Sequence, residues 1–151
     1  MERIMIPWLG FDPAYKAMAN EFELENPQAV IGKEFTHLDT LDRILDEKRL
    51  VIIVSELFGA GNVNLPESVR LDDGAGIAIE GIKRIKLSTT NSQTPIIVYR
   101  GFDYVEGQTL TRRRSEYLDA GARDVYVANN YSGFKSLERF AKTISLYLNS
   151  K

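Results

Sequence analysis

The chain has 151 residues, of which 44% are hydrophobic and 26% are charged, and its net charge is −2. This profile predicts one globular domain with a substantial core, and the small net charge excludes a general attraction to nucleic acid or anionic membrane surfaces. Cysteine is absent, which excludes disulfides, thiol catalysis and thiolate metal sites. With no signal-peptide core and no apolar run of about 20 residues, we expect a cytoplasmic protein.

Strand-like and helix-like segments alternate along the whole chain. In chain order we predict a strand at 3–9, a helix at 13–26, a strand at 29–32, a helix at 40–48, a strand at 50–54, a helix at 77–87, a strand at 96–99, a helix at 110–120, a strand at 125–127 and a helix at 132–148. The helices show apolar spacings of three and four residues, and the third and fourth strands are continuous apolar runs. Strict alternation predicts an α/β fold with a parallel, doubly wound sheet and helices on both faces.

A few residues mark the boundaries of these elements. Asp12 followed by a proline predicts a helix N-cap, whereas Pro7 lacks a backbone donor and fits a strand less well. Gly121 stands where a helix C-terminus requires a left-handed residue. The polar segment 55–74 predicts an unusually long loop, of the kind that is often functional. His37 is the only histidine, so no metal site is expected and this side chain is predicted to be structural or exposed.

Four segments, taken in order, resemble response regulator receiver domains of the CheY-like type. Residues 50–57, LVIIVSEL, resemble the third strand of that family, and residues 81–86, GIKRIK, resemble the helix that follows. Residues 94–101 resemble the fourth strand with its preceding proline, and 118–127 contain the Ala-Gly-Ala turn that leads into the fifth strand. The resemblance implies one receiver-like domain over 1–151, with a flavodoxin-like five-stranded sheet in the order 2-1-3-4-5.

The resemblance also implies a particular chemistry at the carboxyl ends of the strands. In the family, an aspartate that ends the third strand accepts a phosphoryl group, and an acidic pair after the first strand holds Mg²⁺. A hydroxyl at the end of the fourth strand and a lysine at the end of the fifth contact the phosphoryl oxygens. All of these positions lie where wound sheets place their sites.

This sequence departs from the family pattern at almost every one of these positions. Glu56 stands at the acceptor position, or Ser55 does if the register shifts by one residue. Arg100 replaces the hydroxyl, Ala128 replaces the lysine, and Asp12 is the only acid near the position of the acidic pair. The resemblance therefore implies a pseudo-receiver that is not an enzyme, that holds no Mg²⁺ or other cofactor, and that lacks ordinary aspartyl phosphorylation.

Glu56 has two interpretations. In the first, its carboxylate projects negative charge into the pocket, mimics the phosphorylated state and pairs bidentately with Arg100. Such a pair would lock one conformation of a domain that otherwise switches. In the second, the site has decayed and Glu56 is a solvated residue at the end of a strand.

Arg112, Arg113 and Arg114 are predicted to begin the helix at 110–120, on the surface that receivers use to meet partners. Positive charge opposes the dipole at a helix N-terminus, so the cluster is either a partner site or a solvated basic face. Tyr126 is one of several tyrosines in this half of the chain, a residue type that suits interfaces.

The resemblance and these departures predict a module of two-component signal transduction that acts by phosphorylation-independent protein–protein interaction. Its expected partner is a histidine kinase, a transcription regulator or another receiver, with a homodimer as a further alternative; neither membrane nor nucleic acid is expected. A second hypothesis is a module that binds a small ligand such as a nucleotide or cyclic dinucleotide, met by the arginines. An enzyme is a third, weaker hypothesis, because no nucleophile–base pair is visible.

Overall fold

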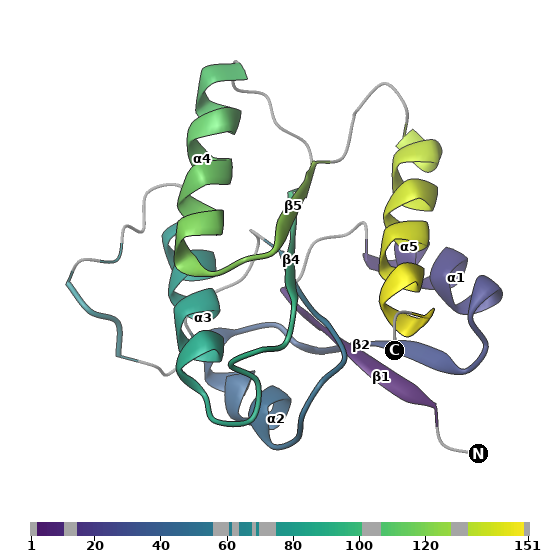
Figure 1. Cartoon of the computed structure of the whole chain (residues 1–151), viewed down its shortest axis with the longest axis horizontal. Coiled ribbons are helices and arrows are strands. Elements are labelled where there is room, and N and C mark those ends of the chain that lie inside the picture. Colours follow the sequence, from purple (N-terminus) through teal and green to yellow (C-terminus); the bar gives the residue numbers. More distant parts are fainter. Residues whose placement is uncertain are drawn as a thin grey trace.

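The computed structural model describes residues 3–10, 15–55, 61, 64–67, 69, 75–100, 107–127 and 133–149. In chain order its elements are β1 (Ile4–Leu9), α1 (Tyr15–Glu25), β2 (Ala29–Phe35), the 3-10 helix η1 (Leu38–Thr40), α2 (Leu41–Leu45), β3 (Ile52–Ser55), α3 (Ala75–Leu87), β4 (Ile96–Arg100), α4 (Gly107–Ala120), β5 (Asp124–Val127) and α5 (Gly133–Asn149). All strand pairs are parallel, and the order is β2-β1-β3-β4-β5. The strands lie between α3 and α4 on one side and α1 and α5 on the other (Figure 1). The predicted doubly wound fold and its strand order are confirmed.

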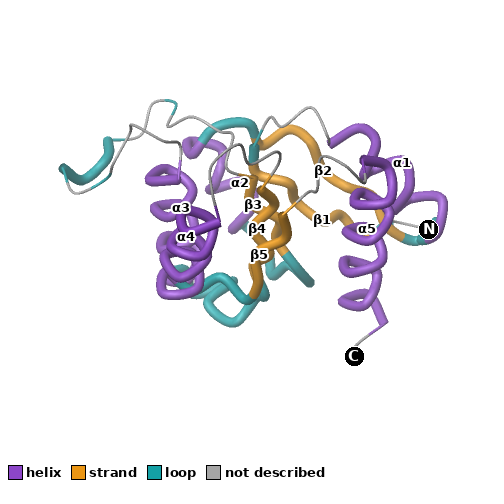
Figure 2. The backbone as a smooth tube through the Cα atoms, turned by 90° about the horizontal axis from the view of Figure 1, so that it is seen from above, coloured by secondary structure: helices purple, strands orange, loops and turns teal. Residues whose placement is uncertain are grey.

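The helices cover both faces of the sheet. Figure 2 shows α1 and α5 on one side and α2, α3 and α4 on the other. Successive residues of a strand point to opposite faces, so Val54 and Val98 pack under α2, α3 and α4, whereas Ile53 and Tyr99 pack under α1 and α5. Both clusters are made of buried apolar side chains, which explains why the third and fourth strands read as continuous apolar runs.

Pro7 lies inside β1, which is flanked by β2 and β3. Its partner on β2 is Gly32, and the register between these strands shifts between Pro7 and Leu9. The pairing of β1 with β3 involves Trp8 and Leu9. The residue without a backbone donor therefore stands beside an irregularity of the ladder, which is how a proline is accommodated in a sheet.

The junction between α4 and β5 confirms the expectation for Gly121. Its φ of 124° lies where residues with a side chain are strained. Its amide donates to the Leu118 carbonyl at 3.1 Å, and the amide of Ala122 donates to that of Tyr117 at 3.0 Å. A Cβ at Gly121 would also lie 2.7 Å from Cγ of Lys86, so this turn needs glycine for space as well as for its backbone angles.

Two predicted helices have a boundary that is wrong by three residues. The helix predicted at 110–120 begins at Gly107, so Arg112, Arg113 and Arg114 lie in its second turn and not at its start. The positive charges of these arginines therefore do not oppose the helix dipole, because the dipole acts on charges in the first turn of a helix. The helix predicted at 40–48 consists of η1 and the short α2, which ends at Leu45.

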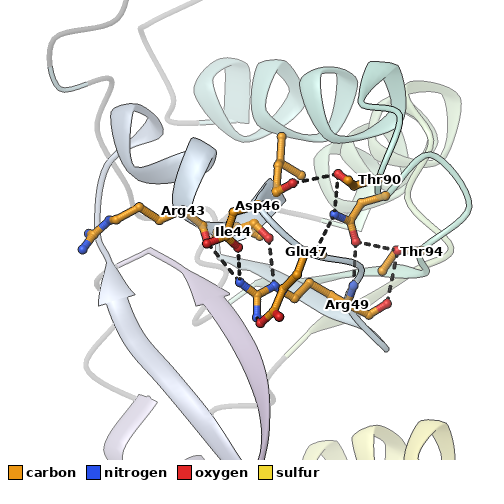
Figure 3. Close-up of polar contacts among 9 residues, drawn as sticks. Arg43, Ile44, Asp46, Glu47, Arg49, Thr90 and Thr94 are labelled. Carbon is orange, nitrogen blue, oxygen red and sulfur yellow. Dashed lines mark hydrogen bonds and ion pairs between the residues drawn. The ribbon is translucent and has the colours of Figure 1, made fainter.

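The side chain of Arg49 explains why α2 ends early. Its Nε donates to the Ile44 carbonyl at 2.8 Å and its Nη2 to the Arg43 carbonyl at 2.9 Å, which satisfies the last carbonyls of the helix (Figure 3). The same guanidinium bonds to Asp46 at 3.0 Å and to Glu47 at 2.6 Å. Its exposed fraction is only 6%, so the guanidinium is buried, and each of its three nitrogens donates a hydrogen bond.

The backbone of Arg49 connects this cap to the loop that precedes β4. Its amide donates to Oδ1 of Asn91 at 2.8 Å, and Nδ2 of Asn91 donates to the Glu47 carbonyl at 3.0 Å. The Thr94 hydroxyl lies 3.2 Å from the Arg49 carbonyl and 2.8 Å from Oδ1 of Asn91 (Figure 3). Two loops that are far apart in the sequence are thereby joined by buried hydrogen bonds.

Arg49→Ala is expected to lower the free energy of unfolding by about 2–4 kcal/mol, because it removes charge-assisted bonds to two helix carbonyls and two carboxylates. Urea titration followed by circular dichroism measures the change. Arg139→Ala, an exposed arginine on α5, serves as the control and should change stability by less than about 0.5 kcal/mol. Equal stability of the two variants would contradict the structural role of Arg49.

Candidate functional site

The carboxyl ends of the parallel strands meet at one edge of the sheet. Leu9 of β1 pairs with Val54, and Ser55 at the end of β3 pairs with Tyr99. Arg100 at the end of β4 pairs with Val127 at the end of β5. Ser55 and Arg100 therefore both end strands at the edge where a wound sheet places its site.

Arg100 is a buried cation at this edge. Its exposed fraction is 3%, and it is one of two buried arginines among the described residues, together with Arg49. A guanidinium keeps its charge at all accessible pH values, and burial requires that acceptors surround it. The end of β4 therefore carries a permanent positive charge where the resemblance places a hydroxyl.

Ser55 is the last residue of β3 and is fully buried. Because side chains alternate along a strand, Ser55 lies on the face of Ile53 and Tyr99, whereas Arg100 lies on the face of Val54 and Val98. Ser55 and Arg100 thus end neighbouring strands on opposite faces of the sheet.

Three of the predicted site residues lie outside the described residues. These are Glu56, which follows Ser55 in the chain, Asp12 and Ala128. The assignment of Glu56 or Ser55 to the acceptor position, and the contact between Glu56 and Arg100, therefore stay predictions.

An aromatic cluster lies near the carboxyl ends of the strands, on the face of the sheet that α1 and α5 cover. The rings of Trp8 and Tyr99 are 5.2 Å apart, and Tyr99 stacks on Tyr126 at 6.3 Å with an interplanar angle of 13°. Phe140 of α5 contacts all three, with centroid distances of 4.9–6.1 Å. The sequence shows that these positions are apolar, but their convergence comes from the strand order. Trp8 is the only tryptophan of the chain, so its fluorescence reports on this edge.

Two of the predicted partner-binding residues have contacts within the fold. Arg114 donates to the Val125 carbonyl at 3.1 Å and pairs with Asp124 at 3.0 Å, which joins α4 to β5. Tyr126 is half-buried and belongs to the aromatic cluster. The side chains of Arg112 and Arg113 lie outside the described residues, although both positions are on α4.

His37 is exposed, as predicted, and its Nδ1 lies 2.9 Å from the Thr36 hydroxyl. Within the part of the chain that the structure describes, no group of three or more His, Asp or Glu side chains is arranged to hold a metal ion. None of the described helices is both long and apolar enough to cross a membrane.

No protein-family model and no curated protein matches the chain. Solved structures do match it, among them a response regulator from Hahella chejuensis with a TM-score of 0.68 at 16% identity, covering 96% of this chain and 95% of that one. The phosphorylated cyanobacterial phytochrome response regulator RcpA matches with a TM-score of 0.65 at 12% identity, covering 99% and 96%. The chemotaxis response regulator CheY4 of Vibrio cholerae gives 0.59 at 14%, covering 94% and 98%. The chain therefore has the CheY-like fold of response regulator receiver domains.

Arg100→Ala is expected to lower the free energy of unfolding by about 2–4 kcal/mol, because it removes a large side chain that is only 3% exposed and leaves a cavity at the end of β4. Arg100→Lys keeps the charge but loses the planar fork, so it should restore only part of this stability. Urea titration of both variants, with the exposed Arg123→Ala as the control, measures the effect. If Arg100→Ala lowers the free energy of unfolding no more than Arg123→Ala does, the buried guanidinium of Arg100 does not stabilise the fold.

Proposed function

We propose that this protein is a regulatory module of the receiver type that acts by binding another protein, without aspartyl phosphorylation and without enzymatic activity of its own. The observation that carries this proposal is the buried Arg100 at the carboxyl end of β4. A receiver hydroxyl can form and release a hydrogen bond to a phosphoryl oxygen, whereas a guanidinium is permanently charged and must always be matched. A buried cation at this position favours a fixed electrostatic state over a reversible one.

We infer that Glu56 supplies the matching negative charge. Glu56 comes two residues after Val54, and residues two apart in a strand point to the same face of the sheet. Val54 shares its face with Val98, and Arg100 lies on that face because it comes two residues after Val98. Ser55, the other candidate for the acceptor position, lies on the opposite face of the sheet, together with Tyr99. A bidentate Glu56–Arg100 pair would hold the domain in one conformation, and a decayed site with a solvated Glu56 is the alternative.

The proposed partner surface is formed by α4, β5 and α5. β5 is the last strand of the sheet, with α4 and α5 on either side of it (Figure 1). Tyr126 is half-buried there and is held by Tyr99 and Phe140, so it could contribute contact area at low entropic cost. The partner classes expected from the resemblance are a histidine kinase, a transcription regulator and another receiver.

A small anionic ligand, such as a nucleotide or cyclic dinucleotide, is a second candidate, and the buried charge of Arg100 is the observation that favours it. Binding to the folded state would raise the melting temperature by mass action. Nucleotides and cyclic dinucleotides, each added in a thermal-shift assay, test this candidate, and Trp8 emission provides a second readout next to the same edge. A saturable change in both would favour the ligand module over the protein-binding one.

Incubation with acetyl phosphate and Mg²⁺ is expected to leave the intact mass of the chain unchanged. The reason is that the resemblance assigns Arg100 to the hydroxyl position and only Asp12 to the region of the Mg²⁺-binding acidic pair. A receiver domain that is readily phosphorylated, treated in the same reaction, is the positive control. The gain of one phosphoryl group, mapped by fragmentation to Ser55 or Asp12, would contradict the proposal.

Glu56→Gln is expected to lower the free energy of unfolding by about 1–3 kcal/mol and to weaken binding to the protein partner, because a neutral amide cannot match the guanidinium. Glu25→Gln, an exposed residue on α1, is the matched control and should change neither property. If Arg100→Ala removes the effect of Glu56→Gln in a double-mutant cycle, the two side chains interact. Unchanged stability and affinity in Glu56→Gln would instead indicate a decayed site.

A further inference from the structure

A groove with a volume of about 480 Å³ lies between the η1–α2 segment and α3. Leucines form its apolar part: Leu38 and Leu41 are buried, whereas Leu87 at the end of α3 is 84% exposed. No other large hydrophobic side chain of the described residues is more exposed than Leu87. Because its lining comes from η1, α2 and α3, the groove is separate from the α4–β5–α5 surface.

The charged side chains of the groove give it a net negative rim. Asp42 of α2 is exposed and lines the groove, as does Asp39 of η1, one helical turn earlier. On the opposite wall, Nε of Arg84 donates to Glu80 at 2.7 Å, and this ion pair offsets the positive charge of the arginine. The groove thus combines an apolar floor with carboxylates along one side.

Two described residues between β3 and α3, Gly61 and Asn64, contact the walls of the groove. Nη2 of Arg84 donates to the Asn64 carbonyl at 3.1 Å. Gly61, with φ of 67°, packs so closely on Asp39 that a Cβ there would meet the carboxylate. Side chains that are already held in place lose less conformational entropy when they bind, which favours their use as an interface.

We propose that this groove docks a short amphipathic segment of a partner protein that carries lysine or arginine next to leucine-like side chains. The apolar side chains of that segment cover Leu87 and the leucine floor, and its basic group faces Asp42. An acidic segment would place like charges together at the rim, and an uncharged ligand would leave the exposed Asp42 carboxylate without a counter-charge. The inference rests on the proposed function in taking the protein as a binding module, and it adds a second surface to that module.

A short helical peptide of leucine and lysine is the probe, titrated into the full chain by isothermal calorimetry, with the chain labelled for NMR in parallel. The expected result is saturable binding together with changes in the NMR chemical shifts of residues in η1, α2 and α3. The matched peptide with glutamate in place of lysine should not bind. Equal binding of both peptides, no saturable binding, or shift changes confined to α4, β5 and α5 would overturn the proposal.

Substitutions on the groove test the two parts of the interaction separately. Asp42→Lys is expected to weaken binding of the lysine peptide about tenfold, equivalent to about 1.4 kcal/mol. Leu87→Ser is expected to weaken the same binding about threefold to tenfold. Asp119→Lys on α4 and Leu24→Ser on α1, where Leu24 is 80% exposed, are the matched controls and should leave the affinity unchanged. Controls that weaken binding as much as the groove variants would overturn the proposal. Phosphorylation by acetyl phosphate would contradict the proposed function and leave groove binding intact, so the two failures are distinguishable.

Discussion

The hydrogen bonds around Arg49 hold together the amino ends of the neighbouring strands β3 and β4. The guanidinium caps the end of α2, while the amide of the same residue donates to Asn91 and its carbonyl accepts from the hydroxyl of Thr94, two residues before β4. The amide of Ile52 then donates to the Pro95 carbonyl at 3.0 Å, so β3 and β4 begin in fixed register. Since a strand transmits its register along its length, this network at the amino ends also determines where Ser55 and Arg100 stand at the carboxyl ends.

The two faces of the sheet carry different side chains. On the α1–α5 side, the cluster of Trp8, Tyr99, Tyr126 and Phe140 forms a rigid support under the carboxyl edge. On the opposite side, α2 and α3 enclose an apolar cluster and leave between them the acidic groove that ends at Leu87. Arg100 belongs to this second face by the alternation of β4. The buried charge of Arg100 and the groove therefore lie on the same side of the sheet, whereas the aromatic cluster lies on the other side.

Much of the fold followed from local patterns. The apolar runs of β3 and β4 predicted strands buried on both faces, and Gly121 predicted the left-handed turn before β5. The end of α2 was missed because Arg49 caps that helix through its side chain, and propensity within the segment carries no signal of such a contact. The start of α4 was missed by three residues, which moved the three arginines away from the helix end.

By itself, the sequence determined the alternation of strands and helices, the parallel wound sheet and the residue types at its edge, because these depend on periodicity and on short-range conformational preferences. The resemblance to receivers also predicted an arginine, Arg100, where a receiver hydroxyl is expected. Only the tertiary structure decided that Arg100 is buried, that Asn26 links α1 to Ser145 of α5 at 2.7 Å, and that Asp42 and Leu87 line one groove. These features join residues that are distant in the chain, and burial and pairing of that kind are set by how the elements pack and not by any local pattern.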